Sequence, residues 1–178
     1  VIRWLDRVGI PDPEKRFGAY PQELSGGQKQ RVLIAMALAG HPDVVIADEP
    51  TTALDVTLQA QVMTLLKKLQ QERGTALLLI THDLAVVKQY ADRVALMYAG
   101  EIVETAPCRD FFASPRHPYA RGLLAAVPTR DKRGAALEGI PGRVPTLSEL
   151  TQMTGCRFAP RCPAAHAVCR RQVPPWQK

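Results

Sequence analysis

Two short apolar runs separated by one amphipathic helix set the strongest limit on the fold of this chain. Residues 44–47 and 75–80 are rich in aliphatic and β-branched side chains, as is typical of strands buried on both faces of a sheet. Between them, residues 58–72 place apolar side chains along one side of a helix that ends at Arg73-Gly74. Strand, helix and strand in this order predict a βαβ unit with parallel strands and helices packed on the sheet.

The flanking segments predict further helices and one hairpin. Residues 1–9 and 28–39 carry apolar side chains at helical spacing, and residues 84–90 predict a shorter helix. Residues 93–98 and 101–104 flank an Ala-Gly pair and predict two antiparallel strands. The fold class is therefore α/β, with a parallel sheet and flanking helices.

The character of the chain changes after Pro107, where prolines recur and long periodic segments stop. We place a domain boundary there, with an α/β domain over residues 1–109 and a small loop-rich, cysteine-containing module over residues 110–178. A length of 178 residues suits one ordinary core and an appendage. Because the first residues already predict a helix, we expect the chain to be part of a longer protein.

Ser25, Gly26 and Gly27 stand directly before the predicted helix of residues 28–39. Backbone N–H groups, a hydroxyl and the positive end of a helix dipole then converge on one place, which favours an anion. Glycine also lets a phosphate approach the backbone closely. Taken alone, these three residues suit a plain turn before a helix as well.

Two carboxylates, Asp48 and Glu49, follow the first predicted strand. The carboxyl ends of parallel strands are where ligands bind in open α/β sheets. One carboxylate there suits the shell of a magnesium ion, and the other suits a general base that polarises a water molecule. The alternative is a pair of acids that cap a loop before Pro50.

His82 follows the second predicted strand, so its side chain should emerge at the same sheet edge as Asp48 and Glu49. A lone histidine is more often structural. Asp55 precedes the helix of residues 58–72 and suits its N-cap, as Asp83 suits the cap of the next helix.

Taken together, these motifs resemble those of ATP-binding-cassette (ABC) ATPases. Leu-Ser-Gly-Gly-Gln-Lys-Gln-Arg at residues 24–31 resembles the signature sequence, and residues 44–49 resemble the Walker B motif. Residues 51–55 resemble the D-loop, and residues 80–83 resemble the segment of the switch histidine. No G-x-x-x-x-G-K-[ST] phosphate loop occurs in the sequence, and since the family places that loop upstream of the signature, we expect it before Val1.

The resemblance implies a role for each of these residues. The signature, with Ser25, Gly26, Gly27 and Gln28, is implied to act in trans on ATP held by a partner subunit, and Asp55 to contact the partner site. The remaining three residues are implied to act in cis: Asp48 on Mg²⁺, Glu49 as the catalytic base and His82 on the γ-phosphate. The implied cofactors are ATP and Mg²⁺.

Residues 111–124, with Arg-His-Pro-Tyr at 116–119, resemble the C-terminal extension of oligopeptide, dipeptide and nickel importer ATPases. This resemblance implies the ATP-hydrolysing, energy-coupling subunit of an importer for dipeptides or oligopeptides. The implied partners are integral membrane permease subunits, a second ABC ATPase subunit and, indirectly, a substrate-binding protein. The implied location is peripheral, at the cytoplasmic face of the cell membrane. The extension itself predicts docking against the ATPase domain rather than chemistry.

Cys156, Cys162 and Cys169 form a C-x5-C-x6-C arrangement. Clustered thiols in a short loop suit an iron–sulfur cluster or zinc, and the absence of bound metal stays open as a third interpretation. The segment resembles the cysteine segment of peptide-importer ATPases, which implies a [4Fe–4S] cluster with a fourth ligand further downstream. Cys108 stands apart and predicts an ordinary, partly buried thiol.

The net charge of +6 suits nucleic acid, anionic lipid or phosphate, and composition does not choose among them. Two alternatives to a transporter subunit follow: a soluble ABC ATPase that acts on nucleic acid, and an inert fragment without a phosphate loop. The Arg-His-Pro-Tyr segment argues against nucleic acid, as does the lack of a basic stripe interleaved with aromatic residues.

Overall fold

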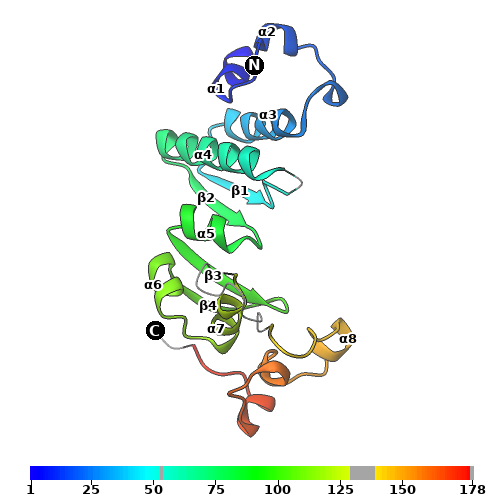
Figure 1. The fold of residues 1–178 in the computed structure, drawn as a ribbon, viewed down its shortest axis with the longest axis vertical. Coiled ribbons are helices and arrows are strands. Elements are labelled where there is room, and N and C mark those ends of the chain that lie inside the picture. Colours follow the sequence, from blue (N-terminus) through cyan, green and yellow to red (C-terminus); the bar gives the residue numbers. More distant parts are fainter. Residues whose placement is uncertain (53, 129–138, 177–178) are drawn as a thin grey trace. The chain divides into compact units, whose positions relative to one another are not determined.

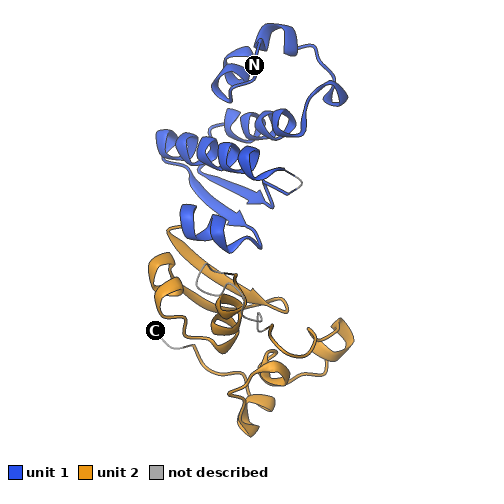
Figure 2. Ribbon diagram, viewed as in Figure 1, with its two compact units in different colours: residues 1–90 blue, residues 91–178 orange. Residues whose placement is uncertain are grey.

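The computed structural model describes residues 1–52, 54–128 and 139–176. The chain divides into two compact units, residues 1–90 and residues 91–178 (Figure 2). The predicted hairpin therefore belongs to the second unit, together with the segment that follows it. The boundary near Asp110, between an α/β domain and a loop-rich module, stays a prediction.

The first unit is built from helices and one pair of strands (Figure 1). Its elements are α1 (Ile2–Arg7), α2 (Pro13–Arg16), a 3₁₀ turn (Pro21–Glu23), α3 (Gly26–Ala39), β1 (Val44–Asp48), α4 (Val56–Arg73), β2 (Ala76–Ile80) and α5 (Leu84–Tyr90). Each predicted helix and strand of this unit is confirmed. The prediction missed α2 and the 3₁₀ turn, because both are too short to show a helical period.

Strands β1 and β2 pair in parallel, in a register that joins Val44 to Ala76 and Asp48 to Ile80. Helix α4 connects them, which confirms the predicted βαβ unit. It ends at Gly74, whose φ of 67° is a left-handed conformation that glycine adopts without a Cβ penalty. The register brings the carboxyl ends of both strands to one sheet edge.

The core of the first unit lies on one face of this small sheet. Val45 and Ala47 point into it, and the other buried members come from the helices and from the segment just after α1: Leu5, Val8, Ile10, Ile34, Ala35, Leu38, Val62, Leu66 and Leu69.

The prediction that the strands are buried on both faces is wrong for the described residues. The side chains of Val44, Ile46, Leu78 and Ile80 are between 45% and 66% exposed. Side chains alternate across a strand, so helices that cover one face leave every second residue of the strand exposed on the other face.

The second unit begins with an antiparallel hairpin of β3 (Arg93–Tyr98) and β4 (Glu101–Pro107). Ala99 and Gly100 both have positive φ, 47° and 82°, as the tight turn between two twisted strands requires. The hairpin is confirmed, and β4 is three residues longer than its predicted end at Glu104.

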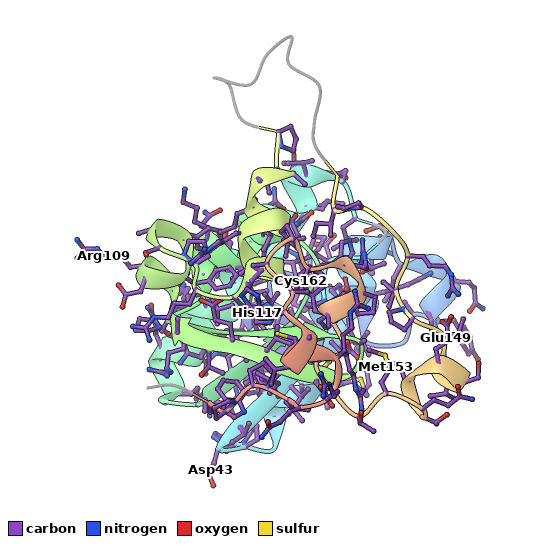
Figure 3. All side chains as sticks on the ribbon, turned by 90° about the horizontal axis from the view of Figure 1, so that it is seen from below. Asp43, Arg109, His117, Glu149, Met153 and Cys162 are labelled. Atoms are coloured by element: carbon purple, nitrogen blue, oxygen red, sulfur yellow. The ribbon has the colours of Figure 1, made fainter. Side chains whose placement is uncertain are left out.

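Short elements follow the hairpin: α6 (Cys108–Ala113), α7 (Pro118–Ala125), α8 (Leu147–Leu150) and 3₁₀ turns at Ala159–Arg161 and Ala167–Arg170. Their core is aromatic. The ring of Phe158 lies edge-on to Tyr98, with centroids 5.1 Å apart, and Tyr119 packs against both. Figure 3 shows His117 among packed side chains, whereas Arg109 points outward.

Cys108, which was predicted to be partly buried, is buried. Across the residues that the structure describes, no helix is long and apolar enough to cross a membrane.

Candidate active site

The signature residues begin helix α3 through a reciprocal cap. Ser25 is the N-cap, and its Oγ accepts a hydrogen bond of 3.3 Å from the backbone N–H of Gln28. In return, the Gln28 side-chain oxygen accepts one of 2.9 Å from the backbone N–H of Ser25. This capping box fixes the path of the chain into the helix and satisfies two donors that would otherwise lack partners.

The two glycines of the signature also serve packing. A Cβ at Gly27 would lie 3.2 Å from a methyl carbon of Leu58, and one at Gly26 would lie 3.6 Å from a methyl carbon of Leu54. Both leucines lie at the start of α4 or just before it. The signature therefore adjoins the D-loop of the same chain, a constraint that the phosphate argument from sequence did not contain.

The end of β1 carries the two predicted acidic residues. Asp48 is the last residue of the strand and is exposed, and Glu49 follows it with a left-handed φ of 48°. The backbone N–H of Glu49 donates to the carbonyl oxygen of Ile80 at 2.9 Å, which extends the sheet by one bond. That bond turns the Glu49 side chain toward the end of β2.

Glu49 and His82 meet there, as the parallel topology predicted. His82 Nδ1 lies 2.7 Å from Glu49 Oε1, and the hydroxyl of Thr52 donates to Glu49 Oε2 at 2.9 Å. The hydrogen bond from His82, followed by that from Thr52, lowers the pKa of the Glu49 carboxyl below its ordinary value. The same hydrogen bond to Glu49 raises the pKa of His82.

The two remaining aspartates cap helices, as predicted. Asp55 accepts from the backbone N–H of Leu58 at 2.9 Å and begins α4. Asp83 accepts from the backbone N–H of Ala85 at 2.8 Å, and its other oxygen accepts from the Gln59 amide at 3.0 Å. Burial opposes ionisation of Asp83, yet the bonds from Gln59 and the backbone lower its pKa overall.

Two contacts of this region were missed from sequence. From sequence, Thr52 had no role beyond its place in the D-loop, and Gln59 had no role. A signal for Thr52 exists in the sequence, since Glu-Pro-Thr-Thr predicts a turn that returns the fourth residue to the first. The Gln59–Asp83 bond joins residues 24 positions apart, and no local pattern predicts it.

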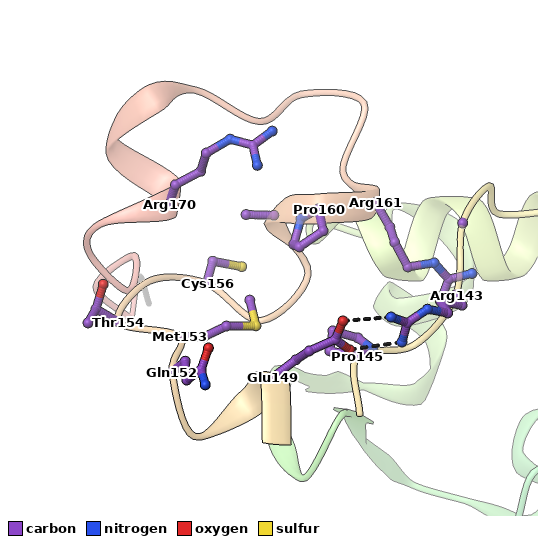
Figure 4. Close-up of a pocket in the computed structure, with 12 residues that line it drawn as sticks. Arg143, Pro145, Glu149, Gln152, Met153, Thr154, Cys156, Pro160, Arg161 and Arg170 are labelled. Carbon is purple, nitrogen blue, oxygen red and sulfur yellow. Dashed lines mark hydrogen bonds and ion pairs between the residues drawn. The ribbon is translucent and has the colours of Figure 1, made fainter. Parts of the chain in front are cut away.

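The predicted iron–sulfur site is not supported by the structure. Within residues 1–52, 54–128 and 139–176, no group of three or more histidine, cysteine, aspartate or glutamate side chains could hold a metal ion. Cys156 lines a cavity of about 550 Å³ beside Met153 (Figure 4), whereas Cys162 lines a different cavity of about 600 Å³.

The cysteine segment is organised by its backbone instead. The N–H of Cys156 donates to the carbonyl oxygen of Cys169 at 2.8 Å, and a Cβ at Gly155 would lie only 2.3 Å from that oxygen. The close approach requires glycine at 155. The three predicted thiol ligands, Cys156, Cys162 and Cys169, are therefore near in sequence but do not form one ligand set among the described residues.

The Arg-His-Pro-Tyr segment docks on the hairpin through a buried carboxylate. Glu104 of β4 is 6% exposed, and its two oxygens accept from the backbone N–H groups of Arg116 at 3.0 Å and His117 at 2.8 Å. His117 then caps α7 by accepting from the N–H of Tyr119 at 3.1 Å. Burial lowers the pKa of His117, which favours the neutral ring that this cap requires.

Comparisons with known proteins agree with this geometry. Residues 1–52 match the ABC transporter family, and residues 103–169 match the oligopeptide/dipeptide transporter C-terminal region. The dimeric structure of a post-hydrolysis state of the ATP-binding cassette MJ0796, bound to ADP and Pi, aligns with a TM-score of 0.53 and 36% identity. That alignment covers 61% of this chain and 45% of the cassette. The aligned part of this chain thus has the fold of an ABC ATPase cassette.

Curated relatives indicate which kind of ABC protein this chain is similar to. A Brucella ovis protein provisionally named a peptide import ATP-binding protein is 53% identical over 181 residues, which cover 98% of this chain and 53% of that protein. The dipeptide transport ATP-binding protein DppD of Bacillus subtilis is 52% identical over 174 residues, or 98% of this chain and 51% of DppD. The chain spans about half the length of these relatives. The chain thus combines a segment that matches the ABC transporter family with one that matches the oligopeptide/dipeptide transporter C-terminal region.

Proposed function

We propose that this chain is part of the ATP-hydrolysing, energy-coupling subunit of an ABC importer for dipeptides or oligopeptides. The observation that carries the proposal is the contact between Glu49 and His82, which stand at the ends of two parallel strands and are 2.7 Å apart. A carboxylate and an imidazole at this edge are suited to position a water molecule beside a terminal phosphate. The named activities of the relatives support peptide import as the process that hydrolysis drives.

The residues fit Mg²⁺ and ATP in distinct ways. Mg²⁺ is usually held by one or two carboxylates together with waters and substrate phosphates, and the exposed Asp48 at the strand end suits such a site. Bound Mg²⁺ would neutralise charge that develops on the phosphates. His82 uses Nδ1 toward Glu49, which leaves Nε2 as the ring nitrogen that can face the γ-phosphate.

The proposed chemistry is a general-base hydrolysis. Glu49 accepts a proton from water as the water oxygen forms a bond to the γ-phosphorus, and the bond from phosphorus to the bridging oxygen breaks to give ADP and phosphate. A lowered pKa keeps Glu49 ionised, and so able to accept a proton, at neutral pH.

The signature residues have a different part in this proposal. Ser25, Gly26, Gly27 and Gln28 bind the ATP of a second ABC ATPase subunit in trans, with Asp55 at the same interface. The dimeric state of the related cassette supports this arrangement. The further partners are permease subunits and, through them, a substrate-binding protein, which places the subunit peripherally at the cytoplasmic face of the membrane. The Arg-His-Pro-Tyr extension supports the peptide class of cargo.

Replacing the proposed base tests the function. Because the chain spans about half the length of its relatives, the test uses the complete subunit assembled with its permease partners. Glu49→Gln keeps the size and most hydrogen bonds of the side chain but removes its basicity, so ATP turnover should fall by about a hundredfold or more while ATP binding persists. Glu14→Gln, at an exposed position of α2, is the matched control and should keep wild-type turnover. Unchanged turnover in Glu49→Gln would exclude the assigned base.

Peptide uptake by vesicles that contain the assembled transporter tests the second half of the proposal. Uptake should require ATP and should stop in the Glu49→Gln transporter, because transport depends on the same hydrolysis. Tight, salt-dependent binding of DNA by the subunit, without permease association, would instead favour a nucleic-acid ATPase.

A further inference from the structure

The turn after β1 returns the chain to the side chain of Glu49. The backbone N–H of Thr52 donates to the carbonyl oxygen of Glu49 at 3.2 Å, which closes a four-residue turn through Pro50. The hydroxyl of the same Thr52 then donates to Glu49 Oε2 at 2.9 Å. One residue thus holds both the backbone and the carboxylate of Glu49.

The carboxylate of Glu49 is consequently held from two sides. His82 Nδ1 contacts Oε1 at 2.7 Å, and Thr52 Oγ1 contacts Oε2. A carboxylate offers about four acceptor sites in total, so both oxygens keep capacity for a further donor such as water. With only the His82 contact, the carboxylate could still rotate about its terminal bond, because that torsion has a broad energy profile.

We propose that Thr52 is a positioning residue, whose hydroxyl orients the Glu49 carboxylate toward the attacking water. This inference rests on the proposed function, since it assumes that Glu49 is the base. A base is effective only when its acceptor lone pair is aligned with the proton that it removes, and small misplacements of a reacting group are costly to the rate. The backbone bond closes the turn without the hydroxyl, so the hydroxyl is free to serve the side chain.

The substitution Thr52→Val removes this hydroxyl and keeps the β-branched shape. The backbone of the turn should persist, since its closing bond comes from the Thr52 N–H. Thr52→Ser retains the hydroxyl and should restore the contact. Thr105→Val is the matched control, because Thr105 is an exposed residue of β4, outside the site.

The experiment compares these variants with the wild type and with Glu49→Gln in the complete subunit with its permease partners, by ATP turnover as a function of ATP concentration. In Thr52→Val, kcat should fall by roughly tenfold to a hundredfold with little change in KM, because orientation of the base matters at the chemical step. Thr52→Ser should recover most of the rate, and Thr105→Val should behave as wild type.

The split between kcat and KM, together with the rescue by Thr52→Ser, supplies a readout that a merely structural role would not move.

The outcomes separate this inference from the proposed function. Wild-type kcat in Thr52→Val, together with the loss of turnover in Glu49→Gln, would overturn the positioning role and leave the function standing. A fall that Thr52→Ser does not recover would also overturn it, because the hydroxyl would then not be the cause. Full turnover in Glu49→Gln would contradict the proposed function itself.

Discussion

Glu49 in the first unit and Glu104 in the second show that the same type of residue can serve either a site or the fold. Glu49 is half-buried, and it contacts the side chains of His82 and Thr52. Glu104 is almost fully buried, and its two oxygens accept hydrogen bonds from two backbone N–H groups. Side-chain partners at an accessible strand end can exchange for water and substrate, whereas a carboxylate enclosed by backbone donors fixes the path of the chain.

Arginine use in the second unit follows the same contrast. Arg161 donates to the carbonyl oxygens of Ile140 and Pro141, and Arg157 donates to the carbonyl oxygen of Ala99 while it pairs with Glu101. Arg157 therefore ties its loop to the hairpin, and Arg161 ties its loop to residues 140 and 141. The second unit adds such side-chain contacts between short elements to its strand pairing and helix caps.

The aromatic core of the second unit offers the largest test of this contrast. Phe158 is 1% exposed and packs against Tyr98 and Tyr119. We expect Phe158→Ala to lower the free energy of unfolding of the second unit by about 3–5 kcal/mol, through lost burial and the cavity that remains. Hydrogen exchange followed by mass spectrometry should show the loss in residues 91–128 and 139–176.

The matched control is Phe17→Ala, because the Phe17 side chain is 59% exposed. It should change the free energy of unfolding by no more than about 0.5 kcal/mol. An equal loss of protection in β1 and β2 of the Phe158→Ala protein would break the distinction between the two units.

Substitution of each glutamate in turn is the next test. Glu104→Ala leaves two part-buried N–H groups without their acceptor, so it should destabilise the second unit by about 2–3 kcal/mol. Glu104→Gln keeps one acceptor oxygen and should lose less. Glu49→Gln should leave the denaturation midpoint nearly unchanged while it stops turnover, and strong destabilisation by Glu49→Gln would contradict the comparison.

Most of the first unit was predictable, because its contacts are local or follow from strand topology. The period of residues 58–72 predicted α4, and parallel strands placed His82 beside Glu49 although 33 positions separate them. The exposed face of β1 and β2 was not predictable, since an apolar run does not reveal how many helical layers cover it.

The second unit was less predictable from sequence. A short cysteine spacing predicted a metal site, but spacing does not fix the direction of a side chain within a loop. The hydrogen bonds from Arg116 and His117 to Glu104 depend on which strand residue faces inward. Glu104 has no distinctive neighbour in the sequence that would reveal this. Irregular segments lack the period on which sequence interpretation depends.

Helix caps in the first unit should give a smaller effect than either buried group. Asp83 accepts from the backbone N–H groups of Ala85 and Val86 at the start of α5. Asp83→Ala should cost about 1 kcal/mol of stability, whereas Asp83→Asn retains an acceptor and should cost less. Chemical denaturation of the two variants measures the difference, and equal losses would show that the carboxylate charge rather than the cap is responsible.

The smallest expected effect compares one capping box from each unit, those at the starts of α3 and α8. The box of Ser25 and Gln28 has no titratable group, whereas that of Thr146 uses Glu149, which also pairs with Arg143 at 2.6 Å. The hydrogen bonds from Arg143 and then from Thr146 lower the pKa of Glu149 from 4.5 to about 2. A carboxyl with a lowered pKa contributes stability that is present above its unfolded pKa and is lost as the pH falls toward its folded pKa.

Protection of residues 143–150 from hydrogen exchange should therefore decrease between pH 4.5 and about 2. The effect should be slight and salt-sensitive, because solvent screens this exposed pair. Glu149→Gln supplies the matched control, since it gives Thr146 the same amide partner that Ser25 has in Gln28 and removes the titration. If the two proteins lost protection with the same pH dependence, the Glu149 carboxylate would not be the group that distinguishes the second box from the first.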